Sequence, residues 1–225
     1  MKVQVKRIYS NKRTSGFKVT YQDKMPYFLK VFHHPLSLKG IASPLLSLSR
    51  PEREFKFSRI LREKGFPVPN VLKFYCRRVG GIFPLNIGYT KSIYLEGLVT
   101  LDKLTPNKNF EKFLEESILL LARLHRSGFI HKDISLSNLG IYNGKVFMID
   151  LEGVYRSFPT PLVKWKNLVN FINDVLKHKV KFNAEEILNL YLKETKTGII
   201  GKNYLYSKIV NLIEKQAKKL TEEEI

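Results

Sequence analysis

The sequence predicts an α+β fold of two lobes, in which an antiparallel five-stranded sheet with one helix precedes a mainly helical lobe. Five short apolar-rich stretches that are typical of strands lie within the first 91 residues, with one helical stretch among them. From Phe110 onward, apolar residues recur at three- and four-residue spacing, which indicates amphipathic helices. We therefore expect an N-terminal lobe over residues 1–92 and a C-terminal lobe over residues 93–225.

The N-terminal lobe shows alternating strand patterns separated by turn residues. A turn at residues 10–16 ends in Ser15-Gly16, and small residues at a hairpin tip can present backbone N–H groups to phosphate. Ser15 and Gly16 are therefore candidate nucleotide-binding residues, although a single glycine is far less specific than a Gly-x-Gly-x-x-Gly motif. The expected strands cover residues 3–8, 17–21, 27–32, 71–79 and 82–91, the last two joined by Gly80-Gly81.

Lys30 is unusual because it stands between apolar residues in the third strand. A strand lysine usually faces solvent, but a lysine that contacts nucleotide phosphates is held by a glutamate on the next helix. A helix is expected from Arg50, with Pro51 at its start and Gly65 at its end. Glu54 shares the apolar face of that helix and is the preferred partner of Lys30, with Glu52 as the alternative.

The most specific pattern is His131-Lys132-Asp133 with Asn138 five residues later, followed by an apolar strand that ends at Asp150. Asn143-Gly144 predicts a hairpin that brings Asn138 and Asp150 together. Phosphoryl transfer needs a carboxylate beside the acceptor hydroxyl, and oxygen ligands for the magnesium ions that neutralise the triphosphate. The pattern therefore predicts a catalytic loop; the alternative is a surface loop that precedes a core strand by chance.

The chain is strongly basic, with 39 Lys and Arg against 20 Asp and Glu and a formal net charge of +19. Such a surface attracts polyanions, whether nucleic acid, anionic lipid or phosphorylated glycolipid, although it can also serve solubility alone. The N-terminus lacks the pattern of a signal peptide, and the longest apolar run, Ile118–Ala122, is too short to span a bilayer. We expect a cytoplasmic chain that at most docks on a membrane surface.

The remaining reactive side chains have structural explanations. Cys76 is the single cysteine, so no intrachain disulfide can form, and its apolar strand favours a packing role. His125 falls on the apolar side of the long helix and is expected to be packed there. His33 and His34 have no other metal-type residues near them in the sequence and are expected to be loop residues.

These motifs together resemble the protein-kinase-like superfamily, and more closely the lipopolysaccharide core kinases, which phosphorylate Kdo or heptose. The resemblance implies ATP as phosphate donor and Mg²⁺ as cofactor, with Mn²⁺ as an alternative metal. It implies that Asp133 is the catalytic base, that Lys30 contacts phosphate and that His131 supports the loop. The resemblance covers about 155 residues and rests on Phe28–Phe32, Arg53–Phe55, Gly65–Pro69, Leu124–Asp133, Asn138 and Ile149-Asp150.

The sequence also departs from regulated protein kinases. Lys132 stands where arginine is usual, and Ser135 stands where Ser/Thr protein kinases carry a lysine. The motif Asp150-Leu151-Glu152 adds a second carboxylate, so that Glu152 is a further candidate metal ligand beside Asn138 and Asp150. Few residues separate Asp150 from Pro159, which leaves no room for a peptide-docking activation segment.

Three functions fit these observations. The first is a kinase for an anionic glycolipid of the lipopolysaccharide inner core, working at the cytoplasmic face of the inner membrane. The second is a small atypical Ser/Thr protein kinase of the RIO type, whose basic surface would suit ribosomal or tRNA-linked partners; nucleic acid is otherwise a disfavoured partner. The third is a kinase-fold binding module without turnover. The sequence predicts neither the acceptor hydroxyl nor the oligomeric state.

Overall fold

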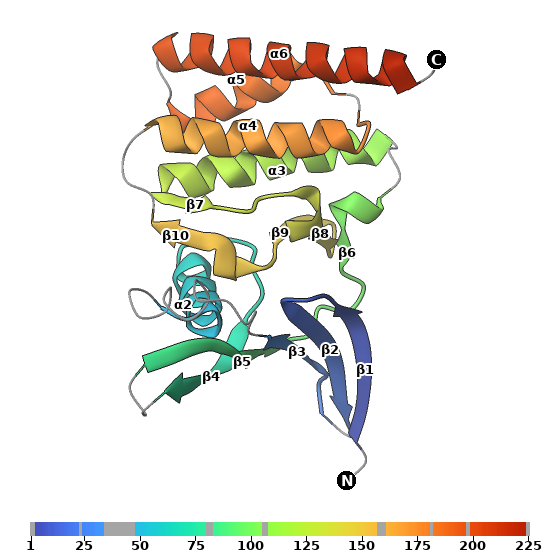
Figure 1. Cartoon of the computed structure of the whole chain (residues 1–225), viewed down its shortest axis with the longest axis vertical. Coiled ribbons are helices and arrows are strands. Elements are labelled where there is room, and N and C mark those ends of the chain that lie inside the picture. Colours follow the sequence, from blue (N-terminus) through green and yellow to red (C-terminus); the bar gives the residue numbers. More distant parts are fainter. Residues whose placement is uncertain are drawn as a thin grey trace. The chain divides into compact units, whose positions relative to one another are not determined.

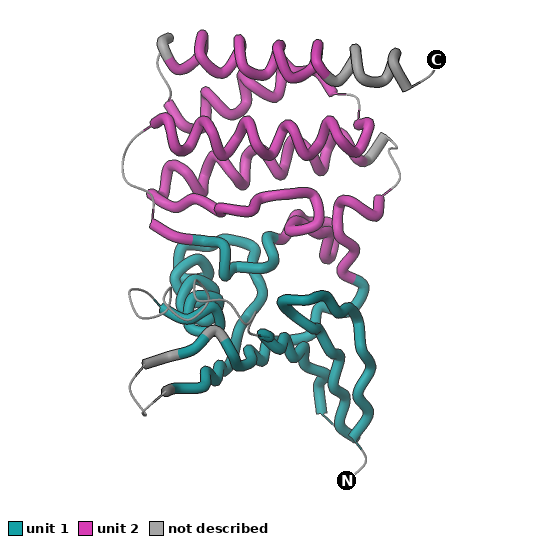
Figure 2. The backbone as a smooth tube through the Cα atoms, viewed as in Figure 1, with its two compact units in different colours: residues 1–97, 148–154 teal, residues 98–147, 155–225 magenta. Residues whose placement is uncertain are grey.

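The computed structural model describes residues 3–22, 24–33, 48–79, 83–104, 108–156, 161–180, 182–196 and 199–223. His34 and the Gly80-Gly81 turn, which the sequence analysis singled out, lie outside these ranges. The chain divides into two compact units (Figure 2): unit 1 comprises residues 1–97 and 148–154, and unit 2 comprises residues 98–147 and 155–225. The predicted lobe boundary after residue 92 differs from this division, in which the segment that carries Asp150 returns to unit 1.

Unit 1 is built on a five-stranded antiparallel sheet in the order β1-β2-β3-β5-β4 (Figure 1), as the sequence predicts. Strand β5 rather than β4 lies beside β3, and β4 forms the edge of the sheet. The strands are β1 (Val3–Ser10), β2 (Thr14–Tyr21), β3 (Tyr27–Phe32), β4 (Val71–Val79) and β5 (Phe83–Ile93). This sheet fixes Lys30 in register opposite Gly16 on one side and Thr90 on the other.

The turn between β1 and β2 is shorter than predicted. The side chain of Asn11 accepts hydrogen bonds from the backbone N–H groups of Arg13 and Thr14, both at 2.8 Å, which closes the turn within three residues. Strand β2 therefore begins at Thr14, and Ser15 and Gly16 lie within it rather than at the tip. The expectation of a turn over residues 10–16 was wrong because the Asn11 side chain supplies the turn's hydrogen bonds locally.

Helix α2 (Arg50–Glu63) packs against β4 and β5 and begins and ends as predicted. At its start, the Glu52 carboxylate accepts hydrogen bonds from the backbone N–H of Ser49 at 2.9 Å and from the Ser49 hydroxyl at 2.7 Å. At its end, Gly65 adopts φ +74°, a left-handed conformation that favours glycine. Glu52 is thus committed to the helix start, whereas Glu54 lies on the buried face.

Unit 2 is mainly helical, as predicted. Helix α3 packs on α5 and helix α4 on α6, and the buried face of α4 includes Leu168, Phe171 and Ile172. Between α3 and α4 lies the region that carries Asp133 and Asn138, in which Asn143 and Gly144 have φ of 50° and 73° and form the predicted two-residue hairpin turn between β8 and β9. The elements that lie wholly or mostly in unit 2 are β6 (Val99–Thr100), η2 (Leu101–Lys103), α3 (Lys108–Arg126), β7 (Phe129–His131), η3 (Leu136–Asn138), β8 (Leu139–Tyr142), β9 (Lys145–Met148), β10 (Val154–Arg156), α4 (Pro161–Lys177), α5 (Ala184–Thr195) and α6 (Ile199–Glu223), with Met148 and Val154 belonging to unit 1. Within the described ranges, no helix is both long and apolar enough to span a membrane.

Candidate active site

Lys30 is the centre of a buried charged cluster in unit 1. Only 3% of the residue is exposed, and its Nζ donates to Glu54 Oε2 at 2.7 Å and to Asp150 Oδ1 at 2.5 Å. Glu54 reaches it from α2, whereas Asp150 reaches it from the segment that follows β9. The structure therefore confirms Glu54 rather than Glu52 as the helix partner of Lys30.

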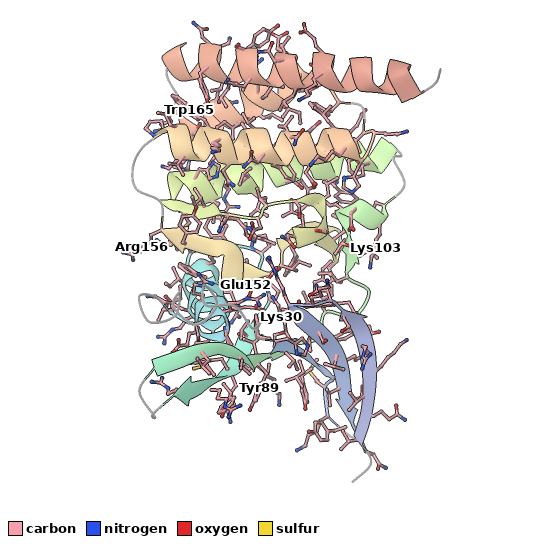
Figure 3. The ribbon with its side chains drawn as sticks, in the orientation of Figure 1. Lys30, Tyr89, Lys103, Glu152, Arg156 and Trp165 are labelled. Atoms are coloured by element: carbon pink, nitrogen blue, oxygen red, sulfur yellow. The ribbon has the colours of Figure 1, made fainter. Side chains whose placement is uncertain are left out.

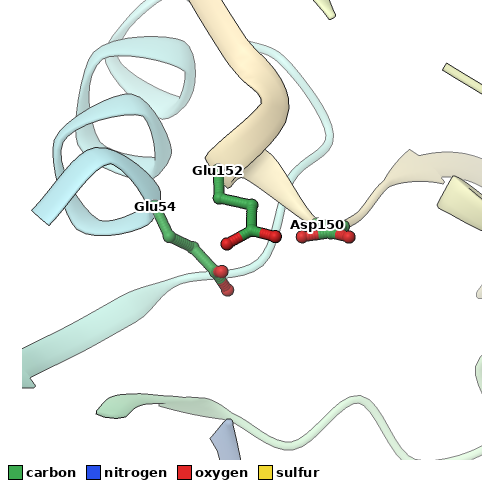
Figure 4. A group of neighbouring side chains, drawn as sticks. All are labelled: Glu54, Asp150 and Glu152. Carbon is green, nitrogen blue, oxygen red and sulfur yellow. The ribbon is translucent and has the colours of Figure 1, made fainter. Parts of the chain in front are cut away.

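Asp150 and Glu152 lie side by side with Glu54 (Figure 4). Each of these three residues offers a carboxylate oxygen within 4.8 Å of the others. Asp150 has φ 60° and ψ 53°, a left-handed backbone conformation that is uncommon outside glycine and that Asn and Asp adopt more readily than other residues. This conformation directly precedes the short helix η4 (Leu151–Gly153), on which Glu152 lies.

Charge within the cluster is unbalanced, because Lys30 and Arg50 face three carboxylates. Burial alone would lower the pKa of Lys30, but Glu54 and Asp150 raise it above its ordinary value, so Lys30 stays protonated. Burial raises the pKa of Glu54 to about 7; Lys30 opposes this rise and Asp150 adds to it. The pKa of Glu54 is thus raised mainly because its carboxylate is buried.

The donor set suits a hard divalent cation. Magnesium takes oxygen ligands and is usually bound by one or two carboxylates together with substrate phosphates. Asp150 suits this role, because 37% of its side chain is exposed whereas only 10% of Glu54 is. Asn138 lies in unit 2, so the sharing of an ion between Asn138 and Asp150 stays a prediction.

Arg50 is a component of the cluster that the sequence analysis did not identify. It is the first residue of α2, and its Nε and Nη2 donate to the two oxygens of Glu152 at 2.7 and 2.6 Å. Its guanidinium also lies 5.1 Å from the centre of the Phe32 ring. No local pattern could have revealed the pair, since its members are 102 residues apart.

Ser15 and Gly16 have internal roles in unit 1. The Ser15 hydroxyl lies 2.8 Å from the hydroxyl of Ser10 and 2.8 Å from His33 Nε2, and only 4% of Ser15 is exposed. A Cβ atom on Gly16 would come within 2.4 Å of the Tyr9 ring, so the glycine allows close packing there. Their assignment to nucleotide binding stays a prediction, and it no longer has the support of a place at the hairpin tip.

The candidate catalytic loop, which lies in unit 2, leaves Asp133 exposed. Asn138 folds back, and its Nδ2 donates to the backbone oxygen of Asp133 at 2.7 Å. Tyr155 is close enough for the Asp133 carboxylate to raise its pKa further, after burial as the larger cause. The Asp133 carboxylate is thus accessible to solvent, and the backbone that carries it is fixed by a hydrogen bond from Asn138 in the same loop.

A buried hydrogen-bond network connects the start of this loop to helices α3, α4 and α5. His131 is 1% exposed, and its backbone oxygen accepts from Asn167 Nδ2 at 2.8 Å. Asn167 Oδ1 lies 2.9 Å from His125 Nε2, and His125 Nδ1 lies 2.7 Å from the Tyr191 hydroxyl. The prediction that His125 is packed is confirmed. Asn167 was missed because an asparagine inside an amphipathic helix gives no sequence signal.

A second support comes from Asp174, also on α4. Its Oδ2 accepts a hydrogen bond at 2.8 Å from the backbone N–H of Leu136, which begins η3. Asn167 and Asp174, both on α4, therefore bind the loop at two points, His131 and Leu136.

The prediction that Cys76 has a packing role is also confirmed, since Cys76 is buried and free.

The fold resembles that of known kinases. A solved Rio2 kinase in an ADP/Mg²⁺-phosphoaspartate complex, from Chaetomium thermophilum, matches with a TM-score of 0.59 and 14% identity over 97% of this chain and 72% of that one. Another Rio2 structure from the same organism gives a TM-score of 0.61 and 15% identity over 93% and 71% of the two chains. This chain has a protein-kinase-like fold. At these identities, the likeness concerns the fold alone.

Sequence relatives are found among sugar kinases. The chain is 28% identical over 150 residues to a 3-deoxy-D-manno-octulosonic acid kinase of Stenotrophomonas maltophilia strain K279a, covering 64% of this chain and 57% of that protein. It is 29% identical over 133 residues to the kinase of the same name from Xylella fastidiosa strain 9a5c, covering 57% and 51%. The chain thus spans about half the length of the curated relatives it matches, and no family model matches it. The motifs predicted a resemblance to Kdo or heptose kinases, and the similarity to proteins named as Kdo kinases confirms it.

Proposed function

We propose that the chain is an ATP-dependent kinase that transfers the γ-phosphate to a sugar hydroxyl of the lipopolysaccharide inner core, on Kdo or heptose. The observation that carries this proposal is Lys30, a buried strand lysine that is ion-paired to Glu54 and to Asp150 at once. Such a site combines a cation for the phosphates with a carboxylate for the metal, as transfer from a nucleotide requires. The fold and the named relatives agree with it.

The two units supply different parts of the reaction. In unit 1, Lys30 contacts the α- and β-phosphates of ATP, and Glu54 keeps its ammonium group in place. Asp150 and Asn138 would hold magnesium, which supplies positive charge to the phosphates when bound. Glu152 is left out of the ligand set because Arg50 engages both of its oxygens.

In unit 2, Asp133 acts on the acceptor. Its carboxylate accepts the proton of the sugar hydroxyl as that oxygen forms a bond to the γ-phosphorus, while the bond from the γ-phosphorus to the bridging oxygen breaks and ADP leaves. The internal hydrogen bond from Asn138 fixes the backbone of Asp133 during this step. His131 supports the loop through its buried backbone oxygen.

The acceptor is assigned from charge and relationship. A formal net charge of +19 favours an anionic acceptor, and the inner core carries carboxylate and phosphate groups. The relatives' name specifies 3-deoxy-D-manno-octulosonic acid, which makes Kdo the first acceptor to test. A substrate anchored in lipid would place the enzyme at the cytoplasmic face of the inner membrane as a peripheral protein.

The test is transfer of labelled γ-phosphate from ATP with magnesium, and with manganese in a parallel reaction. Kdo-lipid A, heptosylated lipid A and a generic protein substrate are offered side by side, with Asp150→Asn as the inactive control. We expect label on a glycolipid that disappears in the control. Label on protein alone would favour the RIO-type alternative, and no label on any substrate would favour a binding module.

A further inference from the structure

The second carboxylate of the Asp150-Leu151-Glu152 motif is engaged by a side chain rather than left open for metal. Arg50 forms two parallel hydrogen bonds with Glu152, at 2.7 and 2.6 Å, in the planar fork geometry that fits guanidinium to carboxylate. The side chains of Arg50 and Glu152 are only 14% and 15% exposed. A partly buried two-point pair of this kind is far less screened by solvent than an exposed one.

The pair joins the helix that carries Glu54 to the segment that carries Asp150, and both of these residues bind Lys30; Lys30 and Glu152 are labelled in Figure 3. Arg50 begins α2, and Glu152 lies on η4, directly after Asp150. Helix α2 and η4 are in extensive contact within unit 1. A bond between Arg50 and Glu152 therefore fixes the helix start relative to the segment that carries Asp150.

Helix periodicity connects this bond to the active lysine. Arg50 and Glu54 are four residues apart on α2 and so lie on the same face, one turn from each other. The first of them holds Glu152 and the second holds Lys30. Any rotation of α2 that released Glu152 would also draw the Glu54 carboxylate away from Lys30.

Two further contacts hold Arg50 itself. Its Nη1 donates to the backbone oxygen of Arg13 in the β1–β2 turn at 3.4 Å, and its guanidinium faces the Phe32 ring. Phe32 ends the same strand that carries Lys30, and the Lys30 Nζ lies 5.0 Å from the same ring. Arg50 thus links the β1–β2 turn, strand β3 and η4.

We propose that Arg50 and Glu152 are a positioning pair that locks α2 so that Glu54 holds Lys30 in its phosphate-binding position. Glu152 is accordingly a structural partner of α2 and not a ligand of the metal. The inference rests on the proposed kinase function for its activity readout, but its binding and exchange readouts do not depend on turnover.

The experiment compares Arg50→Met, Glu152→Gln, the double variant and the reversed pair Arg50→Glu with Glu152→Arg. Each single variant should lower kcat about 10- to 100-fold, because the reacting groups are misplaced and not removed. The double variant should be no worse than either single one, since both break the same interaction. The reversed pair should recover a large part of the loss. Arg59→Met is the matched control, because Arg59 forms an exposed ion pair with Glu63 on the same helix and should change nothing.

Two measurements distinguish a positioning role of the Arg50–Glu152 pair from metal binding by Glu152 and from a general loss of folding. Hydrogen exchange should become faster at residues 50–57 in both single variants, with little change in α3 of unit 2. Mn²⁺ affinity in the presence of ADP, measured by electron paramagnetic resonance, should be little changed in either single variant. If the chain shows no kinase activity, hydrogen exchange and Mn²⁺ affinity still test whether Arg50 and Glu152 hold α2. Failure of the proposed function can therefore be distinguished from failure of this inference.

Several results would overturn the inference. Loss of Mn²⁺ affinity in Glu152→Gln but not in Arg50→Met would make Glu152 a metal ligand. Additive losses in the double variant, or no recovery in a folded reversed pair, would show that the two residues act independently. Unchanged exchange at the start of α2 would show that the pair does not hold the helix.

Discussion

The two units carry polar sites of opposite character. In unit 1 the candidate residues are charged, mostly buried and paired with one another, with Lys30 and Glu54 only 3% and 8% exposed. In unit 2 the candidate base Asp133 is exposed, and its loop is held through its backbone by the neutral side chain of Asn167 and by the carboxylate of Asp174. Charge is concentrated among the residues proposed to bind the triphosphate and the metal, whereas the loop of unit 2 is held by hydrogen bonds to its backbone.

This difference has an energetic reason. Burying a charge is costly unless it is paired, so the cations and carboxylates of unit 1 stabilise one another before any nucleotide arrives. A base that accepts a proton from a substrate hydroxyl must instead be accessible, and its position depends on the backbone that carries it. The two sites should therefore respond differently to substitution.

The largest effect is expected at the charged cluster. Lys30→Met should lower phosphoryl transfer by roughly 1,000-fold and weaken nucleotide binding, because a phosphate contact is lost. It should also reduce the free energy of unfolding by about 3 kcal/mol, since Glu54 is left buried without its cation. Lys73→Met, at an exposed lysine of β4, is the control for replacing a strand lysine in this sheet. Normal turnover in Lys30→Met would contradict the assignment of the cluster.

An intermediate effect is expected where neutral groups support the loop. Asn167→Ala should lower transfer roughly tenfold and the free energy of unfolding by about 2 kcal/mol, because the buried oxygen of His131 loses its donor. Nucleotide affinity, measured by calorimetry, should not change. Asn170→Ala changes an exposed asparagine of the same helix and should be silent. A loss of nucleotide affinity in Asn167→Ala would contradict the prediction that this network affects only the loop of unit 2.

The neutral network also predicts a dependence of stability on pH. Burial lowers the pKa of His125 to about 4; the hydrogen bond with Asn167 opposes this, and Lys164 adds to it. The unfolded chain takes up this proton near pH 6.5, so the contribution to stability is complete above pH 6.5 and is lost as the pH falls toward 4.

Urea unfolding should accordingly give a free energy about 2 kcal/mol lower at pH 5 than at pH 7.5 from this group alone. His125→Gln should reduce that difference, whereas His178→Asn, at an exposed histidine, should leave it intact. An unchanged difference in His125→Gln would mean that other groups cause the pH dependence.

The smallest effect is expected at an exposed ion pair in unit 1. Lys18 Nζ and Glu96 Oε2 lie 2.5 Å apart, but 70% of the Glu96 side chain is exposed. Glu96→Gln should change the free energy of unfolding by no more than about 0.5 kcal/mol, and added salt should remove the difference. A change in the free energy of unfolding as large as that in Lys30→Met would show that burial does not determine how much these ion pairs contribute to stability.

Much of the fold could be predicted because its signals are local. Asn143-Gly144 specifies a tight turn through its own backbone preferences, and Pro51 and Gly65 mark the ends of α2. Lys30 could be predicted because a lysine in the third strand, followed by a helix that carries glutamate, fits the kinase pattern. Glu54 followed from helix periodicity.

The remaining features depend on contacts between distant segments or on side chains that act on the backbone. The fork between Arg50 and Glu152 and the bond from Asn167 to His131 join residues 102 and 36 positions apart. The early end of the β1–β2 turn depends on the Asn11 side chain, which left Ser15 inside a strand. None of these is visible in a pattern of apolar and polar residues.

The central claim is that binding of the nucleotide and activation of the acceptor are served by different residues in the two units. Asp133→Asn tests it most directly, through nucleotide affinity by calorimetry and label transfer to Kdo-lipid A in the same preparation. We predict unchanged affinity for ADP with magnesium, and transfer lowered by about 100- to 10,000-fold. Transfer at the wild-type rate, or loss of nucleotide binding together with transfer, would contradict the account.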